Sequence, residues 1–251
     1  MNRLDKLRDL RRLLASDQAT VGSWMQIPDA SVAEIMGRAG YDWVAVDLEH
    51  GSISIHQLPD LFRSLELGGT LPLARLAEGS AQNCKQALDA GAAGVIAPMI
   101  DTAEQLRSVR DACCWPPVGK RGVGFSRANL FGKDFDAYME EAREPLLVAM
   151  IEHAIAVDNL EEILGVEGLD AIMVGPYDLS ASLGVTGTFS APQFVEAMDR
   201  IRRLTAENHV PCGVHVVDPD SAELKERIEQ GYRFIAYSLD AVFLNKSAVR
   251  P

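Results

Sequence analysis

The chain has 251 residues, of which 47% are hydrophobic and 24% charged, and its formal net charge is −12. This composition is that of a globular protein, and the length suits one large domain or two small ones. The acidic balance argues against a nucleic-acid partner, because phosphate binding needs Lys and Arg side chains gathered on one face. No apolar run approaches the roughly 18 residues that cross a bilayer, so no membrane partner is expected.

The cysteines and the amino-terminal segment bear on the compartment. Cys84, Cys113, Cys114 and Cys212 show no metal-binding spacing, and the two adjacent cysteines make a poor disulfide pair. Residues 2–16 carry a polar amphipathic helix pattern instead of a charged segment followed by an apolar one, so no secretory signal is visible. We therefore expect reduced thiols and a cytoplasmic protein.

Eight apolar runs typical of buried strands follow this first helix. They are Thr20–Met25, Trp43–Leu48, Leu71–Leu76, Gly94–Pro98, Leu146–Ile151, Ala171–Val174, Pro211–Val216 and Arg233–Tyr237. Helical patterns lie between nearly all of them, at Ser31–Ala39, Ile55–Leu67, Ala81–Ala90, Thr102–Cys113, Ala156–Leu164, Ala191–Asn208 and Asp220–Gln230. Several of these helices end at a glycine, where a helix C-cap is expected.

Strand and helix units in this number and order predict a single-domain (β/α)8 barrel, the TIM-barrel fold, over residues 1–251. The alternative is a doubly wound open sheet, although no G-x-G-x-x-G sequence follows the first strand. The longest irregular segment, Trp115–Lys133, comes after the fourth strand, and a loop of that length is usually functional or disordered. We expect it to border the mouth of the barrel.

The second apolar run ends in three ionisable residues, Asp47, Glu49 and His50. Charged groups at the end of a buried strand are costly unless they have partners or a ligand. In barrels the carboxyl ends of the strands are where ligands bind, so this segment predicts the position of an active site. From the pattern alone His50 is a general acid or base, a metal ligand or a structural histidine.

Other strand ends add candidate residues. Arg75 ends the third run and needs an anionic partner, either Asp47 or Glu49 on the next strand or an anionic substrate. Asp89 ends a helical pattern, where the helix dipole disfavours a carboxylate, which indicates another requirement such as orienting a histidine. His215, within the seventh run, can face the mouth, but a supporting position behind the mouth residues is the favoured interpretation.

Glu152 and Asp178 follow the fifth and sixth runs and so lie on neighbouring strands. Two such carboxylates suit a hard divalent cation such as Mg2+ or Mn2+. The alternative is that each caps the helix that follows it. No lysine lies within any of the apolar runs, which argues against a Schiff-base mechanism.

Taken together these segments resemble the class II pyruvate aldolases of the HpcH/HpaI family. The matching motifs are Asp47-Leu-Glu-His-Gly51, Leu73-Ala-Arg-Leu76, Leu88-Asp-Ala-Gly-Ala-Ala-Gly-Val-Ile-Ala-Pro98, Pro117-Val-Gly-Lys-Arg-Gly122, Ile151-Glu152 and Gly175-Pro-Tyr-Asp-Leu-Ser180. Each motif is weak alone, and the ordered set is specific. The resemblance implies a barrel whose last helix is exchanged between paired subunits, in a homohexamer built as a trimer of dimers.

The resemblance also implies a metal site and the partners of the protein. Glu152 and Asp178 would hold a divalent cation, Mg2+ or Mn2+ with Co2+ as a further choice. The substrates would be a small 2-oxoacid, pyruvate or a relative such as hydroxypyruvate, and an aldehyde. Gly175 and the backbone N–H groups near Tyr177 and Asp178 would surround the oxoacid's carboxylate.

Catalytic roles follow from the same resemblance. Arg75 would contact the ketone oxygen and stabilise the enolate, and His50, oriented by Asp89, would move the proton of the aldehyde or 4-hydroxyl oxygen. Asp47 and Glu49 would act through other groups without touching the substrate. Trp24 would lie near the tail of the aldehyde.

The chain departs from the family pattern beside the predicted metal site. Met150 stands where family members commonly carry glutamine, which removes a polar group, and His153 stands where a small hydroxyl residue is more usual. Two alternative functions remain open from the sequence. One is a relative that uses the same enolate in a decarboxylase-type or acyl-CoA lyase reaction, and the other is a catalytically silent barrel that only binds a metal or an oxoacid.

Overall fold

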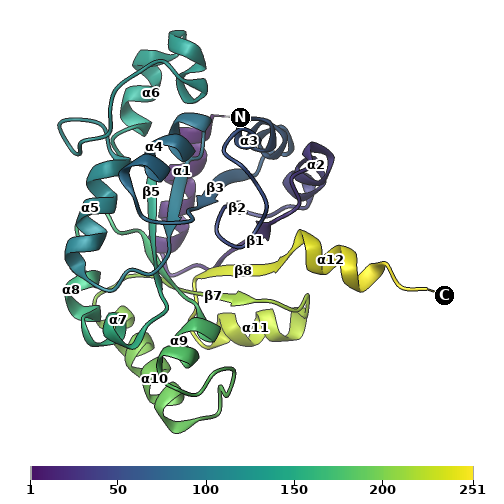
Figure 1. The fold of residues 1–251 in the computed structure, drawn as a ribbon, viewed down its shortest axis with the longest axis vertical. Helices are drawn as coiled ribbons and strands as arrows, with labels where there is room; N and C mark the ends of the chain where they lie inside the picture. The colour runs from purple at the N-terminus through teal and green to yellow at the C-terminus, as the bar shows by residue number, and fades with distance from the viewer. Residues whose placement is uncertain (1, 251) are drawn as a thin grey trace.

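Eight parallel strands close into a barrel in the computed structural model, which describes residues 2–250 (Figure 1). The strands are β1 (Thr20–Met25), β2 (Trp43–Asp47), β3 (Leu71–Arg75), β4 (Gly94–Ala97), β5 (Leu146–Ile151), β6 (Ala171–Val174), β7 (Cys212–Val216) and β8 (Phe234–Leu239). They follow one another around the barrel in chain order, and β8 pairs with β1. This closure confirms the (β/α)8 prediction and excludes the open sheet. Met1 and Pro251, the ends of the predicted domain, lie outside the described residues.

Helices surround the barrel and connect its strands. They are α1 (Arg3–Ala15), α2 (Ala30–Arg38), α3 (Leu58–Gly68), α4 (Ala81–Ala90), α5 (Ala103–Cys113), the 3-10 segment η1 (Arg127–Gly132), α6 (Phe135–Glu141), α7 (Ala154–Asp158), α8 (Leu160–Leu164), α9 (Pro176–Ser182), α10 (Pro192–Glu207), α11 (Ser221–Glu229) and α12 (Asp240–Ser247). Within residues 2–250 none of them is both long and apolar enough to cross a bilayer.

The interior of the barrel is filled by side chains, and α1 closes its amino end. Leu7, Leu10 and Leu14 of α1 are buried in the same cluster as the inward-facing residues of the strands. Inside, the rings of Trp43 and Phe234 stack with centroids 4.2 Å apart. A substrate can therefore enter only from the opposite end, where the strands finish.

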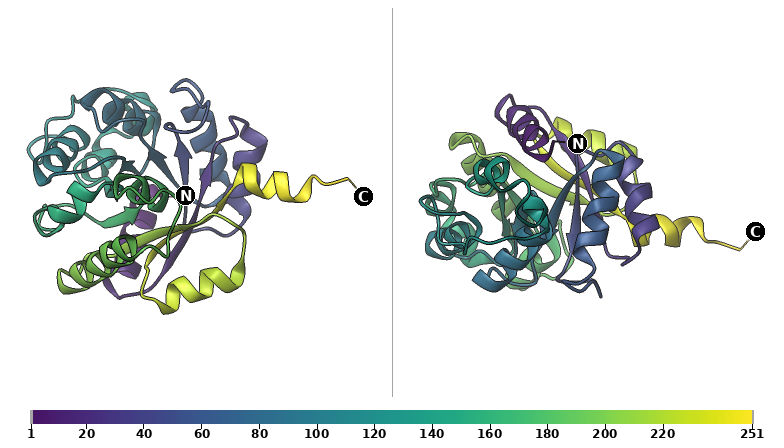
Figure 2. Two further views of the ribbon diagram at one scale, coloured as in Figure 1. Left: turned by 60° about the horizontal axis from the view of Figure 1, so that its bottom comes forward. Right: turned by 90° about the horizontal axis from the view of Figure 1, so that it is seen from above.

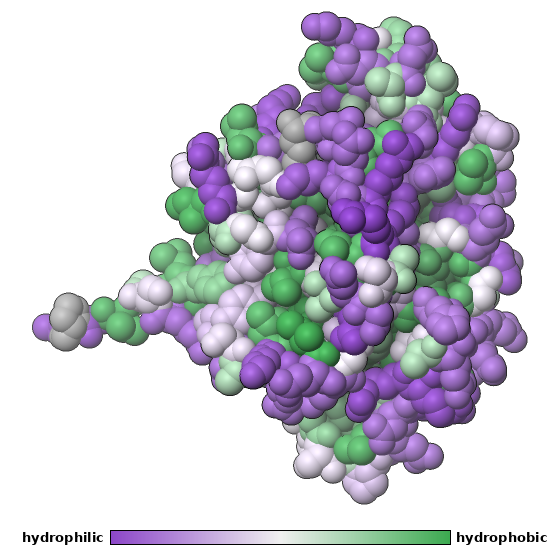
Figure 3. Space-filling model, turned by 180° about the vertical axis from the view of Figure 1, so that it is seen from behind, coloured by the Kyte–Doolittle hydropathy of each residue, from purple (hydrophilic) through white to green (hydrophobic). Residues whose placement is uncertain are grey.

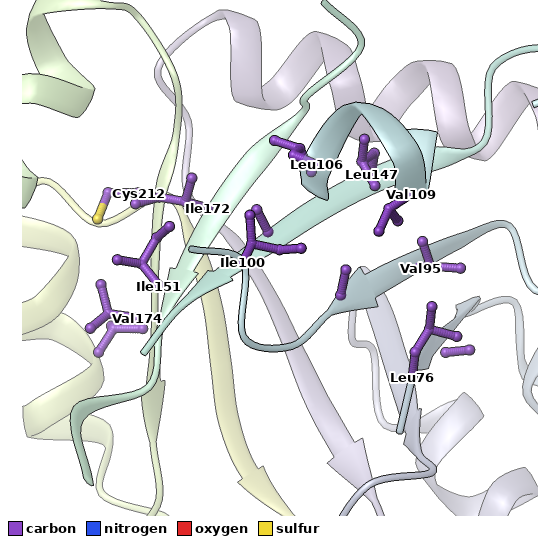
Figure 4. Packing of buried hydrophobic residues seen from close by; sticks show 14 of the residues in the cluster. Leu76, Val95, Ile100, Leu106, Val109, Leu147, Ile151, Ile172, Val174 and Cys212 are labelled. Carbon is purple, nitrogen blue, oxygen red and sulfur yellow. The ribbon is translucent and has the colours of Figure 1, made fainter. Parts of the chain in front are cut away.

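The outward faces of the strands form a second core beneath the helices. Figure 4 shows Val95, Leu147 and Ile172 of the strands in one packed layer with Leu106 and Val109 of α5. Both faces of each strand are thus buried, which explains why the strands are continuous apolar runs in the sequence.

The last helix, α12, leaves the barrel instead of packing along it (Figures 1 and 2). Its Leu244 is 59% exposed, and Val249 beyond it is 72% exposed. Figure 3 shows hydrophobic residues along this projecting segment and on the surface beside its base. A single chain leaves these apolar groups in contact with water.

Some predicted elements were wrong in detail. The helix predicted over Ala156–Leu164 is two short helices, α7 and α8, which meet at Asn159. The segment Trp115–Lys133 does not border the mouth, because α5 first returns the chain to the amino end of the barrel. There Arg127 pairs with Glu66 at the end of α3 and donates to the Ala90 carbonyl at the end of α4.

Candidate active site

A pocket of about 220 Å3 opens at the carboxyl ends of the strands. Its lining comes from nearly every strand end and comprises Trp24, Gln26, Asp47, His50, Arg75, Met150, Glu152, Met173, Val174, Gly175, Pro176, Tyr177, Asp178, His215, Val217 and Leu239. Pockets for drug-sized ligands are larger, at about 300–1,000 Å3. This one suits a small metabolite.

A second hollow, of about 640 Å3, lies at the opposite end of the barrel, and we do not assign the chemistry to it. Its cationic groups already have acidic partners: Arg233 pairs with Asp17 and Arg203 with Glu207. The pocket at the strand ends is smaller, but it gathers carboxylates, a guanidinium and two histidines. We therefore take it as the candidate active site.

Arg75 is the central cation of this pocket. Only 7% of the residue is exposed, and its guanidinium lies 3.7 Å from Asp47 Oδ2 and 3.5 Å from Glu152 Oε1 and pairs with Glu49. Its charged carbon also lies 5.5 Å from the centre of the Trp24 ring. The two sequence alternatives for Arg75 are therefore compatible, because it forms the ion pairs and lines the pocket.

Asp47 shapes the turn that carries the other residues of its motif. Its Oδ1 accepts hydrogen bonds from the N–H groups of Glu49, at 3.0 Å, and His50, at 3.2 Å. Its Oδ2 accepts a third from the Gln26 side chain, at 2.9 Å. Asp47 thus places Glu49 against Arg75 and sets His50 at the rim, where its side chain is exposed.

Glu152 is a deeply buried carboxylate with few partners. Its Oε2 accepts a hydrogen bond from the Met99 N–H at 3.0 Å, and Arg75 is its nearest cation. Burial raises its pKa, with further contributions from Glu49 and Asp178, while Met99 and Arg75 lower it. Gly175 makes the position possible, since a Cβ built there would lie 2.5 Å from Glu152 Oε1.

Neither carboxylate of the predicted metal pair caps a helix, so the alternative interpretation of these residues was wrong. Helix α7 is capped by His153, whose Nδ1 accepts from the Ile155 N–H at 3.1 Å. Helix α9 begins at Pro176 with Gly175 as its N-cap, which places Asp178 inside the first turn.

The donor set fits a hard divalent cation. Glu152 and Asp178 both line the pocket, and each contributes carboxylate oxygens. Among residues 2–250 no group of three or more potential metal-binding side chains converges. Mg2+ tolerates this, because it keeps several waters and binds through one or two carboxylates plus the substrate.

The structure does not bring all the predicted site residues together. Asp89 lies on α4 with its carboxylate 3.8 Å from Arg121 Nη1, and within residues 2–250 it forms no ion pair with His50. The Gly175 N–H is occupied by the Ile151 carbonyl at 3.2 Å, so this glycine contributes space instead of a free donor. Tyr177 lines the pocket at the rim and is 60% exposed.

Comparison with known proteins decides the family. The family model of HpcH/HpaI aldolase/citrate lyase matches residues 20–246. The chain belongs to this family. A hydroxypyruvate/pyruvate aldolase of Roseobacter denitrificans is 32% identical over 241 residues, which are 95% of this chain and 93% of that protein. A 2-keto-3-deoxy-L-rhamnonate aldolase of Escherichia coli K12 is 37% identical over 233 residues, 91% of this chain and 86% of the relative.

A solved structure agrees with this assignment. The crystal structure of an HpcH/HpaI aldolase/citrate lyase family protein from Burkholderia cenocepacia superposes with a TM-score of 0.89 at 31% identity, covering 95% of both chains. As a member of this family of aldolases the protein is a carbon–carbon lyase, which confirms the enzyme class predicted from the sequence.

Some residues that line the pocket were missed or given too little weight in the sequence analysis. Gln26 bonds to Asp47, His215 lies in the wall beside Trp24, and Met150 and Met173 pair across β5 and β6 inside the barrel. The available signal was the alternation along each strand, because Met150 lies two residues before Glu152 and so shares its face.

Proposed function

We propose that the protein is a metal-dependent aldolase that reversibly cleaves a 4-hydroxy-2-oxoacid into an aldehyde and pyruvate or a related 2-oxoacid such as hydroxypyruvate. The observation that carries the proposal is the convergence of Arg75, Glu152 and Asp178 in one small pocket at the carboxyl end of the barrel. The names of the Roseobacter and Escherichia relatives support the same reaction class.

Glu152 and Asp178 would hold the cation, Mg2+ or Mn2+ or Co2+, since both offer carboxylate oxygens and line one pocket. Such an ion supplies Lewis-acid stabilisation of the negative charge that develops on the oxygens of the 2-oxoacid. Within residues 2–250 the buried Glu152 carboxylate has only Arg75 and one N–H to offset its charge, so a cation here also relieves an electrostatic cost.

Arg75 would donate to the ketone oxygen of the bound oxoacid. Asp47 and Glu49 hold the guanidinium in place without touching the substrate. The first-turn N–H groups of Tyr177 and Asp178 have no carbonyl partner within α9, so they are available to the carboxylate of the oxoacid. The substrate is thereby fixed at both ends.

His50 would move the proton that the reaction transfers at the 4-hydroxyl. In the cleavage direction it accepts that proton as the C3–C4 bond breaks, and the bond's electron pair moves into the enolate whose oxygen faces Arg75. Within one chain Asp89 does not reach His50. The orienting role proposed for Asp89 therefore requires a carboxylate supplied by a second subunit.

A homo-oligomer is accordingly part of the proposal: a hexamer built as a trimer of dimers, with α12 exchanged between paired subunits. The support is that α12 projects from the barrel with Leu244 exposed, where a partner would bury it (Figure 1). Light scattering after gel filtration, with the full chain and with a chain shortened after Asp240, which keeps the carboxylate that binds Gln26 and Ile27, tests the assembly; a monomeric full chain contradicts it. We also place the enzyme in the cytoplasm, since all four cysteines are free and buried.

Exchange of the methyl protons of pyruvate for deuterium tests the reaction without knowledge of the aldehyde. We expect rapid exchange with Mg2+ or Mn2+ present and its loss in EDTA. Glu152→Gln should abolish the metal-dependent exchange, whereas Glu161→Gln, at an exposed position on α8, should not. Absence of exchange under all conditions would favour a silent barrel, and exchange without any aldol cleavage would favour another lyase reaction of the same enolate.

A further inference from the structure

His215 is the one histidine of the pocket to which the proposed mechanism gives no task. It lies on the inward face of β7, and its ring packs against Trp24 with centroids 5.9 Å apart. The other groups on this side of the pocket, Met173, Val217 and Leu239, are apolar. A polar ring in an apolar wall needs hydrogen-bond partners for both of its nitrogens.

One nitrogen of His215 has its partner within the protein. Nε2 lies 3.2 Å from the carbonyl oxygen of Ser238 on β8. A carbonyl oxygen only accepts, so Nε2 carries a hydrogen. Burial lowers the pKa of His215 to about 4, with Arg75 contributing in the same direction, and the ring is neutral at pH 7.

The second nitrogen is left as an acceptor with a free lone pair. In the described part of the chain Nδ1 has no hydrogen-bond partner. It is also absent from the buried side-chain nitrogens that lack a partner, so it is accessible. Because His215 lines the pocket, Nδ1 opens onto it. At this lone pair a neutral imidazole with Nε2 protonated can accept a hydrogen bond from an O–H or N–H donor.

Ser238 fixes the orientation of the His215 ring through its carbonyl oxygen. Ser238 has a φ of 53°, a left-handed conformation that is uncommon for a residue with a side chain. Its hydroxyl donates to the Val217 carbonyl at 2.9 Å, and its own carbonyl accepts a second hydrogen bond from Ser23 Oγ at 3.1 Å. These contacts from β1, β7 and β8 hold the carbonyl that directs His215, so the acceptor is preorganised.

His215 also lies at the reacting end of the pocket and not at its rim. Its ring packs against Trp24 with centroids 5.9 Å apart, and the charged carbon of Arg75 lies 5.5 Å from the centre of the same Trp24 ring. Arg75 marks the place of the ketone oxygen in the proposed function, and the carbon next to that ketone is C3 of the oxoacid. A substituent on C3 is therefore the part of the substrate within reach of the wall that His215 occupies.

We propose that His215 Nδ1 accepts a hydrogen bond from a hydroxyl group on C3 of the 2-oxoacid, which selects hydroxypyruvate over pyruvate as the donor. The inference rests on the proposed function for the placement of the oxoacid. With pyruvate the acceptor is left facing a methyl group and loses its hydrogen bond, which disfavours that donor.

Equilibrium binding of the two oxoacids to the Mg2+-loaded protein, measured by calorimetry, tests the proposal together with kcat/KM for each donor. The wild-type protein should bind hydroxypyruvate about tenfold more tightly than pyruvate, the value of one neutral hydrogen bond. His215→Leu should remove this preference while pyruvate binding stays within about threefold. His215→Gln, whose amide can donate to Ser238 and still accept from a hydroxyl, should retain most of it.

His56→Leu is the matched control, since it makes the same substitution at an exposed histidine outside the pocket lining and should leave the preference intact. Thermal melting checks that each variant folds, and if the leucine variant fails to fold, His215→Phe, which also lacks an acceptor and should also lose the preference, takes its place. Equal losses for both donors, or an unchanged ratio in His215→Leu, would overturn the proposal. A binding preference that depends on His215 without turnover of either donor would instead refute the proposed function and leave this inference standing.

Discussion

Replacement of Arg75 by alanine should nearly abolish enolisation of pyruvate. Removing one donor aimed at a developing oxyanion costs about 100- to 1,000-fold in rate, or about 2.7–4 kcal/mol. Arg75 is 7% exposed and has three carboxylates around it, so water cannot replace the guanidinium without exposing Asp47, Glu49 and Glu152 to one another. We expect the upper part of that range.

Initial rates of deuterium exchange into pyruvate, followed by NMR at saturating Mn2+, measure this effect directly. Loss of Arg75 also removes the cation nearest to Glu152, which raises the pKa of that carboxyl further and changes its affinity for a metal cation. Calorimetric titration of Mn2+ separates the effect on metal binding from the effect on the exchange rate. Arg75→Lys keeps the positive charge but not the planar guanidinium, so its exchange rate should fall by an intermediate factor of about 10- to 100-fold. If the alanine variant, fully loaded with metal, exchanges within threefold of the wild-type rate, the assignment of Arg75 is refuted.

Three further predictions concern the metal site, the core and the pH dependence. Gly175→Ala should weaken Mn2+ binding about 10- to 100-fold, because its Cβ would displace the Glu152 carboxylate; an unchanged calorimetric titration would contradict this. Gly22→Ala should lower the free energy of unfolding in urea by about 1–3 kcal/mol, since its Cβ would lie 2.0 Å from the Trp43 ring; wild-type stability would argue against the packing described. For His215 the folded pKa of about 4 lies below the value of about 6.5 expected when unfolded, so the unfolded state takes up the proton first as the pH falls. Between pH 7 and pH 4 the free energy of unfolding in urea should therefore fall by up to about 3 kcal/mol more for the wild-type protein than for His215→Leu. Equal decreases in the two proteins would show that this ring stays solvated.

The barrel was predictable because buried parallel strands leave a plain signal. Runs such as Leu146–Ile151 are apolar on both faces, and the helices between them carry a separate periodicity. Short elements were less predictable. Asn159 divides one predicted helix into two short ones, and α9 has seven residues that begin at a proline. These helices are too short to show a helical periodicity of apolar residues in the sequence.

The site was predictable where neighbouring strand ends bring residues together by topology. Arg75 meets Glu49 and Glu152 because β2, β3 and β5 finish at the same end of the barrel. The place of Trp115–Lys133 was not predictable from its position after a strand, because the intervening α5 reverses the direction of the chain. The partners of Asp89 also depend on a fold-level contact, here with Arg121, that no spacing in the sequence encodes.

The packing of α1 against the last strand determines when the barrel can close during synthesis. Its three leucines are synthesised before any of the strands, but the cluster that buries them includes Phe234 of the last strand. At about 5–20 residues per second, roughly 10–40 s pass before that residue is synthesised. During this interval the first helix has no complete binding surface. Closure of the barrel is therefore a late event in biosynthesis, completed when the Asp240 carboxylate accepts the N–H groups of Gln26 and Ile27.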